Sequence, residues 1–317
     1  TLRSILLQGY PKLRYRVLDG GSQDDTVQVL EKYSAWIDYW HSKPDGGQSD
    51  AINQGLQMVW EETQADVANW LNSDDYLLPG ALRAIGRAFA ADASTMAVLG
   101  RGRIFGGGLP TRISAGTDIH PTLAETMGRA RIDQPQTWFR VAATRQMGLL
   151  HQALFYVMDV DWWLRYLLCY GLAHHVRIPD LLVNFRLHEV AKTQAGPEEM
   201  VRERDQVQRA LARAADVHAF ETTFRDVLQT PERTDYAFSW PAAAQLAAEV
   251  RPALNYFLLQ KALEYYERYN REQAELCFAA IEEAALDEAA LARLRSYRWR
   301  NTWLPGPVLR LLRRLTR

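Results

Sequence analysis

Residues 69–82, NWLNSDDYLLPGAL, place two adjacent carboxylates where an apolar run ends and a helix pattern begins. Repulsion and desolvation make the pair Asp74 and Asp75 costly unless a cation or hydrogen-bond donors meet it. Carboxylate oxygens suit Mg²⁺ or Mn²⁺, which complete their coordination with substrate phosphates and water. Alternatively, Asp75 stabilises the start of the helix through the macrodipole. The stretch therefore predicts a strand end at which a charged ligand binds, with the helix-start role as the alternative.

On both sides of this stretch, short β-rich runs alternate with longer amphipathic ones. The pattern predicts strands at 15–19, 35–40, 66–71 and 95–100, and helices at 25–34, 48–63 and 79–91. Strands that alternate with helices form a parallel sheet with helices on its faces. Ligands bind beyond the carboxyl ends of such strands, where Asp19 joins Asp74 and Asp75.

After residue 100 the pattern continues with loops, helices and strands and then changes to a second, helical region. Residues 100–135 are rich in Gly and Pro and predict a hairpin and loops; a phosphate cradle is the weaker interpretation of these glycines, because no helix start follows them. Further helices are predicted at 142–148 and 159–171, and β-like runs at 173–179 and 181–188. A linker at 192–199 and almost wholly helical patterning over 198–300 place a domain boundary near residue 196.

The composition excludes several classes of protein. A net charge of -1 over 317 residues argues against a nucleic-acid binder. Cys169 and Cys277 lie far apart, which excludes a disulfide framework or a zinc motif and fits a reducing cytoplasm. No apolar run is long enough to span a membrane. Residues 293–317 hold eight arginines and no acid, which favours a tail bound to anionic lipid over a solvated one.

Six stretches carry a resemblance that extends from residue 1 to about residue 193: VLDGGSQDDT (17–26), KPDGGQSDAINQGL (43–56), NWLNSDDYLLPGAL (69–82), QPQTWFR (134–140), MDVDWWLRYLLCYG (158–171) and FRLHEVAKT (185–193). In this order they resemble the successive motifs of bacterial family 2 glycosyltransferases with the GT-A fold. The resemblance implies an α/β, Rossmann-like domain over 1–196 with a mixed, mainly parallel sheet, followed by an α-helical C-terminal region over 197–317.

The resemblance also implies an activity. A family member would transfer a sugar, with inversion, from a nucleotide-sugar donor to a hydroxyl of a glycan or polyprenyl-linked acceptor in the synthesis of a bacterial surface polysaccharide. A divalent cation, Mn²⁺ or Mg²⁺, would neutralise the charge that grows on the departing diphosphate. Such an enzyme would work in the cytoplasm, at the inner face of the cell membrane.

By resemblance, four residues would contact the nucleotide sugar. Asp19 would bind the base or ribose, Asp45 and Asn53 would line the nucleotide pocket, and Asp74 would face the ribose or the metal. Asp75 would bind the cation. Two alternatives stay open, because Asp19 at a strand end and Asp45 in PDGG are also typical turn residues.

The resemblance assigns the catalytic base to the motif MDVDWWLR. Asp159 aligns best with the acid that deprotonates the acceptor, although this chain has Met158 before it where the family often has Glu. Asp161 is the alternative, as the base, an acceptor contact or a helix-start acid. Trp163 is expected in the core rather than stacked on a sugar.

The remaining assignments concern the metal, phosphates and acceptor. His188 would face the metal or the diphosphate, or else serve as a hydrogen-bonded structural residue. Arg186 and Lys192 would neutralise phosphate, and Gln136 and Trp138 would contact the acceptor.

The start of the chain suggests a rival function. TLRSILLQGYP (1–11) resembles the first helix of the family, so the strand that precedes it in the family is expected to be missing. That expectation makes a non-catalytic sugar-nucleotide-binding or scaffold protein the rival. A glycoside hydrolase also uses paired carboxylates, but it would not explain the ordered motifs.

Overall fold

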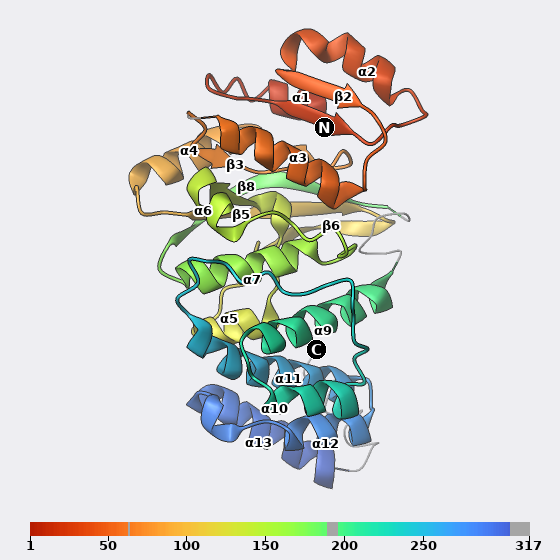
Figure 1. Ribbon diagram of the computed structural model, residues 1–317, viewed down its shortest axis with the longest axis vertical. Helices are drawn as coiled ribbons and strands as arrows, with labels where there is room; N and C mark the ends of the chain where they lie inside the picture. Colours follow the sequence, from red (N-terminus) through yellow and green to blue (C-terminus); the bar gives the residue numbers. More distant parts are fainter. Residues whose placement is uncertain (63, 189–195, 305–317) are drawn as a thin grey trace. The chain divides into compact units, whose positions relative to one another are not determined.

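The computed structural model describes residues 1–62, 64–188 and 196–304 and divides into two compact units (Figure 1). Unit 1 comprises residues 1–119, 131–204 and 239–245, and unit 2 comprises 120–130, 205–238 and the chain from residue 246 on. The boundary predicted near residue 196 lies close to the division after Arg204. The short excursion at 120–130 was not predicted.

A mixed sheet forms the centre of unit 1, as predicted. Its strands run in the order β3 (Val67–Ala68), β7 (Thr137–Arg140), β5 (Ala97–Gly106), β8 (His175–Leu187) and β4 (Tyr76–Leu77), and β6 (Leu109–Ser114) pairs with β5. A separate parallel pair joins β1 (Arg16–Asp19) to β2 (Tyr39–Ser42). Among the described residues, four of the six strand pairings are antiparallel, so the sheet is not mainly parallel. The reason is that β7 runs opposite to both of its neighbours, β6 turns back along β5, and β4 runs opposite to β8.

Helices cover the sheet on both faces. The helices of unit 1 are α1 (Leu2–Leu6), α2 (Thr26–Tyr33), α3 (Gln48–Glu61), α4 (Ala81–Ala91), α6 (Val141–Met147) and α7 (Met158–Tyr170), with short turns η1 (Ser34–Trp36) and η2 (Gln134–Gln136). Ile85 and Phe89 of α4 pack with Val98 and Leu182 on one face. Phe139 on β7 points to the other face, where it contacts Trp162 of α7 with ring centroids 5.1 Å apart. Trp163 is fully buried, so its predicted core position is confirmed.

The predicted hairpin after residue 100 is confirmed, because β5 turns into β6 through three glycines that all have positive φ. A Cβ at Gly106 would lie 2.4 Å from the carbonyl oxygen of Leu187, so this turn needs glycine. Two predicted strands are shorter than expected. Residues 35–40 form η1 and the start of β2, and residues 66–71 contain only the two-residue β3.

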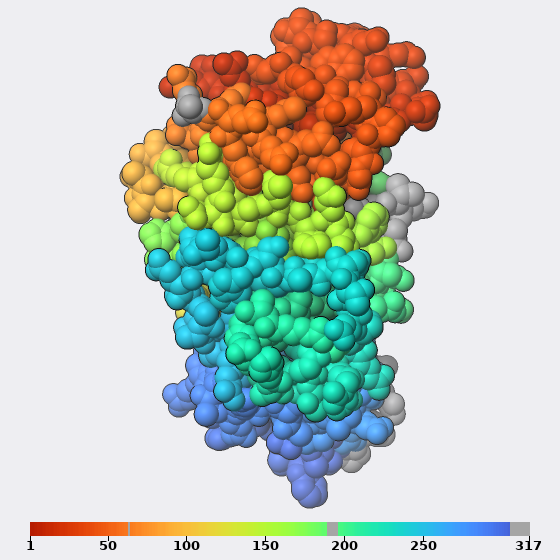
Figure 2. Space-filling view, in the orientation of Figure 1, coloured from red at the N-terminus to blue at the C-terminus, as the bar shows by residue number. Residues whose placement is uncertain are grey.

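Unit 2 is built from helices: α5 (Leu123–Arg129), α9 (Pro197–Ala214, from Asp205 on), α10 (Ala219–Thr222), α11 (Val250–Glu267), α12 (Arg271–Ala279) and α13 (Glu288–Trp303), with short turns η3 (Thr223–Val227), η4 (Ala247–Glu249) and η5 (Glu283–Ala285). Over the face of unit 2 drawn in Figure 2, the green residues of α9 and α10 adjoin the blue residues of α12 and α13.

Helix α5 lies in a region predicted as hairpin and loops. Its start is capped by Thr122, whose hydroxyl accepts the Glu125 amide at 3.0 Å, and this Thr-x-x-Glu spacing is visible in the sequence. A Cβ at Gly128 would lie 2.5 Å from the carbonyl oxygen of Ala253, so only glycine permits this approach of α5 to α11.

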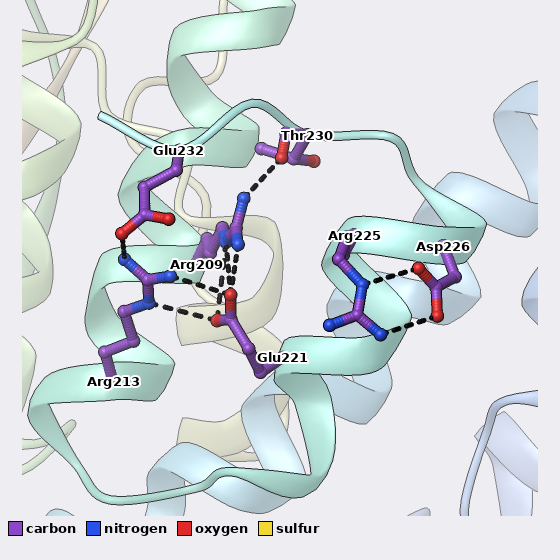
Figure 3. Close-up of polar contacts among 7 residues, drawn as sticks. All are labelled: Arg209, Arg213, Glu221, Arg225, Asp226, Thr230 and Glu232. Atoms are coloured by element: carbon purple, nitrogen blue, oxygen red, sulfur yellow. Dashed lines mark hydrogen bonds and ion pairs between the residues drawn. The ribbon is translucent and has the colours of Figure 1, made fainter. Parts of the chain in front are cut away.

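The segment after η3 is irregular, although 198–300 was predicted to be almost wholly helical. Arg209 donates to the Thr230 carbonyl at 2.5 Å, and Arg213 donates to Glu232 at 2.8 Å, so two arginines of α9 anchor this segment (Figure 3). Both also bind Glu221, and the hydrogen bonds from Arg209 and Arg213 lower the pKa of Glu221 to about 2. These bonds take the place of helical ones in a stretch that proline interrupts.

Candidate active site

One cleft of about 2600 Å³ in unit 1 collects most of the predicted site residues. The end of β1, the loop after β2, the loop after β3 and the start of α7 all border it. Five of the acids and histidines predicted for the site line it: Asp19, Asp45, Asp74, Asp159 and His188. Apolar side chains line its deeper part, among them Val17, Leu18, Val67 and Leu71. Within the described residues, β1 pairs only with β2 and β3 only with β7, so both strands present an unpaired edge.

Asp19 organises the turn that follows β1. Its carboxylate accepts the amides of Gly21 at 3.1 Å and Ser22 at 2.9 Å, and the hydroxyl of Ser42 on β2 at 2.6 Å. Burial opposes ionisation, but the hydrogen bonds from Ser22 and Ser42 outweigh it and lower the pKa of Asp19 below its usual value. Asp19 therefore does act as a turn residue, and it does so with a carboxylate that borders the cleft.

The loop after β2 packs against the Asp19 turn. A Cβ at Gly20 would lie 3.1 Å from a carboxylate oxygen of Asp45, which shows how closely the two loops approach. Asp45 accepts the Gly47 amide at 2.8 Å, and Gly47 has a φ of 100° that favours glycine. The PDGG stretch is thus a turn, as its composition suggests, and it also brings Asp45 to the cleft.

The two acids of the opening stretch lie in different environments. Asp74 is partly exposed in the cleft, and its Oδ2 lies 2.9 Å from Nε2 of His188. Asp75 is fully buried; its Oδ1 accepts the Arg186 amide at 3.0 Å, and its Oδ2 accepts no hydrogen bond from any described residue. His188 therefore pairs with Asp74, not with Asp75, which does not line the cleft.

Burial is the largest influence on Asp75 and raises its pKa to about 7, while the Arg186 amide opposes the shift and the charge of Asp74 adds to it. Between its usual pKa near 4 and pH 7, the folded protein therefore holds a proton that the unfolded chain has released. Protonation of Asp75 therefore stabilises the folded state. In metal-free buffer, lowering the pH from 8 to 5.5 should increase the contribution of Asp75 to the free energy of unfolding.

We expect Asp75→Asn to abolish that contribution and to raise the melting temperature at pH 8 by roughly 2–4 °C. Thermal unfolding in EDTA at pH 8 and 5.5 checks this, with the exposed Asp180→Asn as the matched control. Equal pH dependence in wild type and Asp75→Asn would mean that Asp75 titrates normally.

Helix α7 separates its two acids. Asp159 lies in the first turn, lines the cleft and accepts the Val160 amide at 2.9 Å. Asp161 is fully buried, and its Oδ2 accepts Nε of Arg165 at 3.0 Å. Arg165 is 2% exposed and also donates to two backbone carbonyls. The structure thus corrects the alternative assignment, because Asp161 faces the core and cannot reach an acceptor.

Of the residues predicted to contact the acceptor or the nucleotide, some line the cleft and others are buried away from it. Gln136 and Trp138 line the cleft, and Gln136 Oε1 and Trp138 Nε1 have no hydrogen-bond partner among the described residues. Asn53 does not line the cleft; it is buried and exchanges two hydrogen bonds with Leu150, at 2.9 and 2.8 Å. Its amide therefore braces a loop, which corrects its assignment to the nucleotide pocket.

Two further assignments concerned phosphate. Arg186 is exposed and does not line the cleft; its backbone amide, not its guanidinium, binds Asp75. Lys192 lies outside the described residues. Instead, Arg112 and Arg131 line the cleft, from a region predicted as hairpin and loops. Arg131 is held there by Asp118 at 3.0 Å. In the sequence, the feature that could have pointed to Arg131 is its position as a cation just before the QPQTWFR motif.

The comparison with known sequences identifies the class of protein. Residues 1–164 match the family described as glycosyl transferase family 2, and the chain belongs to this family. Two curated relatives from strains of Mycobacterium tuberculosis, each named an uncharacterized glycosyltransferase, are 44% identical over 72 residues. That match spans 21% of this chain and 28% of each relative.

Among solved structures, the chain resembles TarS of S. aureus. One TarS structure aligns with a TM-score of 0.55 and 15% identity over 95% of this chain, and the match covers 50% of the TarS chain. TarS 1–349 in complex with UDP aligns at 0.54 with 16% identity, and its complex with UDP-GlcNAc at 0.55 with 15% identity. These shorter chains are covered to 83% and 84%. The likeness confirms the GT-A-like fold.

Proposed function

We propose that this protein is an inverting, metal-dependent glycosyltransferase that moves a sugar from a nucleotide-sugar donor to a hydroxyl acceptor. One observation carries the proposal: a single cleft in a family 2 domain is lined by Asp74 with His188 and by Asp159. The first pair suits the diphosphate end of a donor. The second position suits a general base.

The proposed reaction needs one proton transfer and one displacement. The Asp159 carboxylate accepts the proton of the acceptor hydroxyl, and the acceptor oxygen attacks the anomeric carbon. A new carbon–oxygen bond forms as the bond from that carbon to the diphosphate breaks, so the configuration inverts. The nucleoside diphosphate leaves with both electrons of the broken bond. A positioned base of this kind contributes about 10²–10⁴-fold to the rate.

The donor set fits a divalent cation. No three His, Cys, Asp or Glu side chains gather into a metal-binding group within the described ranges. Mn²⁺ and Mg²⁺, however, often take only one or two protein ligands and complete their coordination with substrate phosphates. Asp74 and His188 would hold the ion, and its positive charge would favour the ionised form of the neighbouring buried Asp75, whose Oδ2 has no hydrogen-bond partner among the described residues. The bound ion would neutralise charge on the departing diphosphate.

A solved relative supports the proposed donor class. Because TarS binds UDP and UDP-GlcNAc, we propose a uridine nucleotide sugar as the donor. Gln136 and Trp138 line the cleft, which supports their proposed place beside an acceptor, a glycan or a lipid-linked sugar used in surface polysaccharide synthesis. The rival is a protein that binds the nucleotide sugar without transferring the sugar.

Attachment to a membrane surface through the arginine-rich tail at 293–317 stays a prediction, because residues 305–317 lie outside the described part. In the described part of the tail, Arg293, Arg295 and Arg298 of α13 pair with Glu125, Glu283 and Glu275. In the described ranges, no helix has both the length and the apolar character needed to cross a bilayer.

The first experiment is a thermal-shift screen with UDP, GDP, dTDP and CMP, each with and without Mn²⁺. A ligand that binds only the folded state stabilises it and so raises the melting temperature. At a ligand concentration of 100 times Kd, the free energy of unfolding rises by about 2.7 kcal/mol. We expect a Mn²⁺-dependent shift with UDP that Asp74→Asn abolishes. Turnover of UDP-GlcNAc then separates the enzyme from the rival, since a binding protein shows the shift but releases no UDP. A shift with none of the nucleotides contradicts the donor site.

A further inference from the structure

Glu203 binds the loop that carries the start of α7. This residue lies in the unit 1 part of α9 and is 7% exposed. Its Oε1 accepts the Phe155 amide at 2.9 Å, and its Oε2 accepts the amides of Tyr156 at 2.5 Å and Val157 at 2.9 Å. One carboxylate thus satisfies three consecutive backbone donors from 46 to 48 residues away.

The position of these donors matters for the proposed base. Val157 is the N-cap residue of α7 and has no side chain that can cap a helix. Of the three amides, that of Val157 is one of the first amides of the helix, which need partners from outside it. Those of Phe155 and Tyr156 belong to the loop that leads into the helix. Asp159 follows only two residues after Val157, so the geometry of its backbone depends on how this loop is held.

A second contact ties the same loop to α9. A Cβ at Gly196 would lie 2.4 Å from the hydroxyl oxygen of Tyr156, so the backbone just before α9 packs closely against the Tyr156 ring. Tyr156 itself lines the cleft beside Asp159. The start of α9 therefore fixes one wall of the cleft through Glu203 and Gly196.

We propose that Glu203 is a positioning residue that holds the 155–157 loop and thereby aims Asp159 at the acceptor. The role rests on the proposed function of Asp159. Glu203 does not line the cleft, so it acts through the loop and not on the substrate. Misplacing a reacting group by about 1 Å can cost about 100-fold in rate, which sets the scale of the effect.

The test compares Glu203→Ala and Glu203→Gln with Glu199→Ala, a control at an exposed position of the same helix. Hydrogen exchange of the amides at 155–160 reports the loop directly and needs no activity. We expect Glu203→Ala to speed this exchange about 10-fold or more while exchange in β5 stays unchanged. Glu203→Gln keeps one acceptor oxygen, so it should recover part of the protection.

Steady-state kinetics complete the test. We expect kcat of Glu203→Ala to fall about 10- to 100-fold with less than a twofold change in KM for the donor, and Glu203→Gln to restore part of kcat. Unchanged exchange at 155–160 would overturn the anchoring, and faster exchange with unchanged kcat would overturn the positioning role. If Glu203→Ala does not fold, the same criteria apply to Glu203→Gln. A wild type with normal protection but no turnover would instead refute the proposed function.

Discussion

Asp159→Asn is expected to lower kcat for sugar transfer by about 10²–10⁴-fold, because the amide cannot accept the proton of the acceptor hydroxyl. The substitution preserves the shape of the side chain, and Asp159 is a partly exposed residue of the cleft. Folding and nucleotide binding should therefore be retained. Initial rates of UDP release in the presence of acceptor measure the loss, and the UDP-induced thermal shift measures binding.

Asp180→Asn is the matched control for charge, since Asp180 is an exposed acid of unit 1 outside the cleft. It should keep wild-type turnover. Full activity of Asp159→Asn would remove Asp159 from the role of base. Loss of both turnover and the UDP-induced shift would assign Asp159 to donor binding instead.

The second large effect is on stability. Arg165→Met should cost about 3–5 kcal/mol of unfolding free energy, because it leaves a buried carboxylate without its counter-ion. Asp161 is fully buried, and Arg165 also donates to the carbonyls of Met147 at 2.8 Å and Leu149 at 2.7 Å. The substitution removes all of these bonds at once. Urea denaturation followed by circular dichroism measures the change.

Two variants make the result specific. Arg225→Met breaks an exposed ion pair with Asp226, whose side chains are 62% and 52% accessible, and should leave the urea midpoint unchanged. Asp161→Leu combined with Arg165→Met should recover part of the loss, because no unpaired charge then remains buried. A loss in Arg165→Met no larger than in Arg225→Met would mean that water reaches Asp161.

Much of the unit 1 fold and part of the site followed from local patterns. The alternation of β-rich and amphipathic runs predicted β1, α2, α3 and α4 close to their observed bounds. The positions of Asp19 and Asp74 after predicted strands indicated that they would meet at one edge, and both line the cleft, as does Asp45, which was assigned there by resemblance. Backbone propensity and hydrophobic period act over a few residues, so a sequence can reveal them directly.

Chain pairings that are distant in sequence were not predictable in this way. Glu203 binds residues 155–157, Asn53 binds Leu150, and residues 120–130 leave unit 1 to pack with α11. None of these contacts leaves a periodic signal in the sequence, because each depends on two segments that only folding brings together.

The sequence by itself predicted two pairs of acids as candidates for the site, and tertiary structure decided which member of each pair lines the cleft. Asp159 and Asp161 lie about 200° apart around the axis of α7. That helix is buried almost all round, from Val160 to Leu168, so no polar face in the sequence marks the side that meets the cleft. Asp74 and Asp75 differ for the same physical reason. Neighbouring side chains point in different directions, and only the packing of β8 against this loop shows that Asp75 turns inward while Asp74 meets His188.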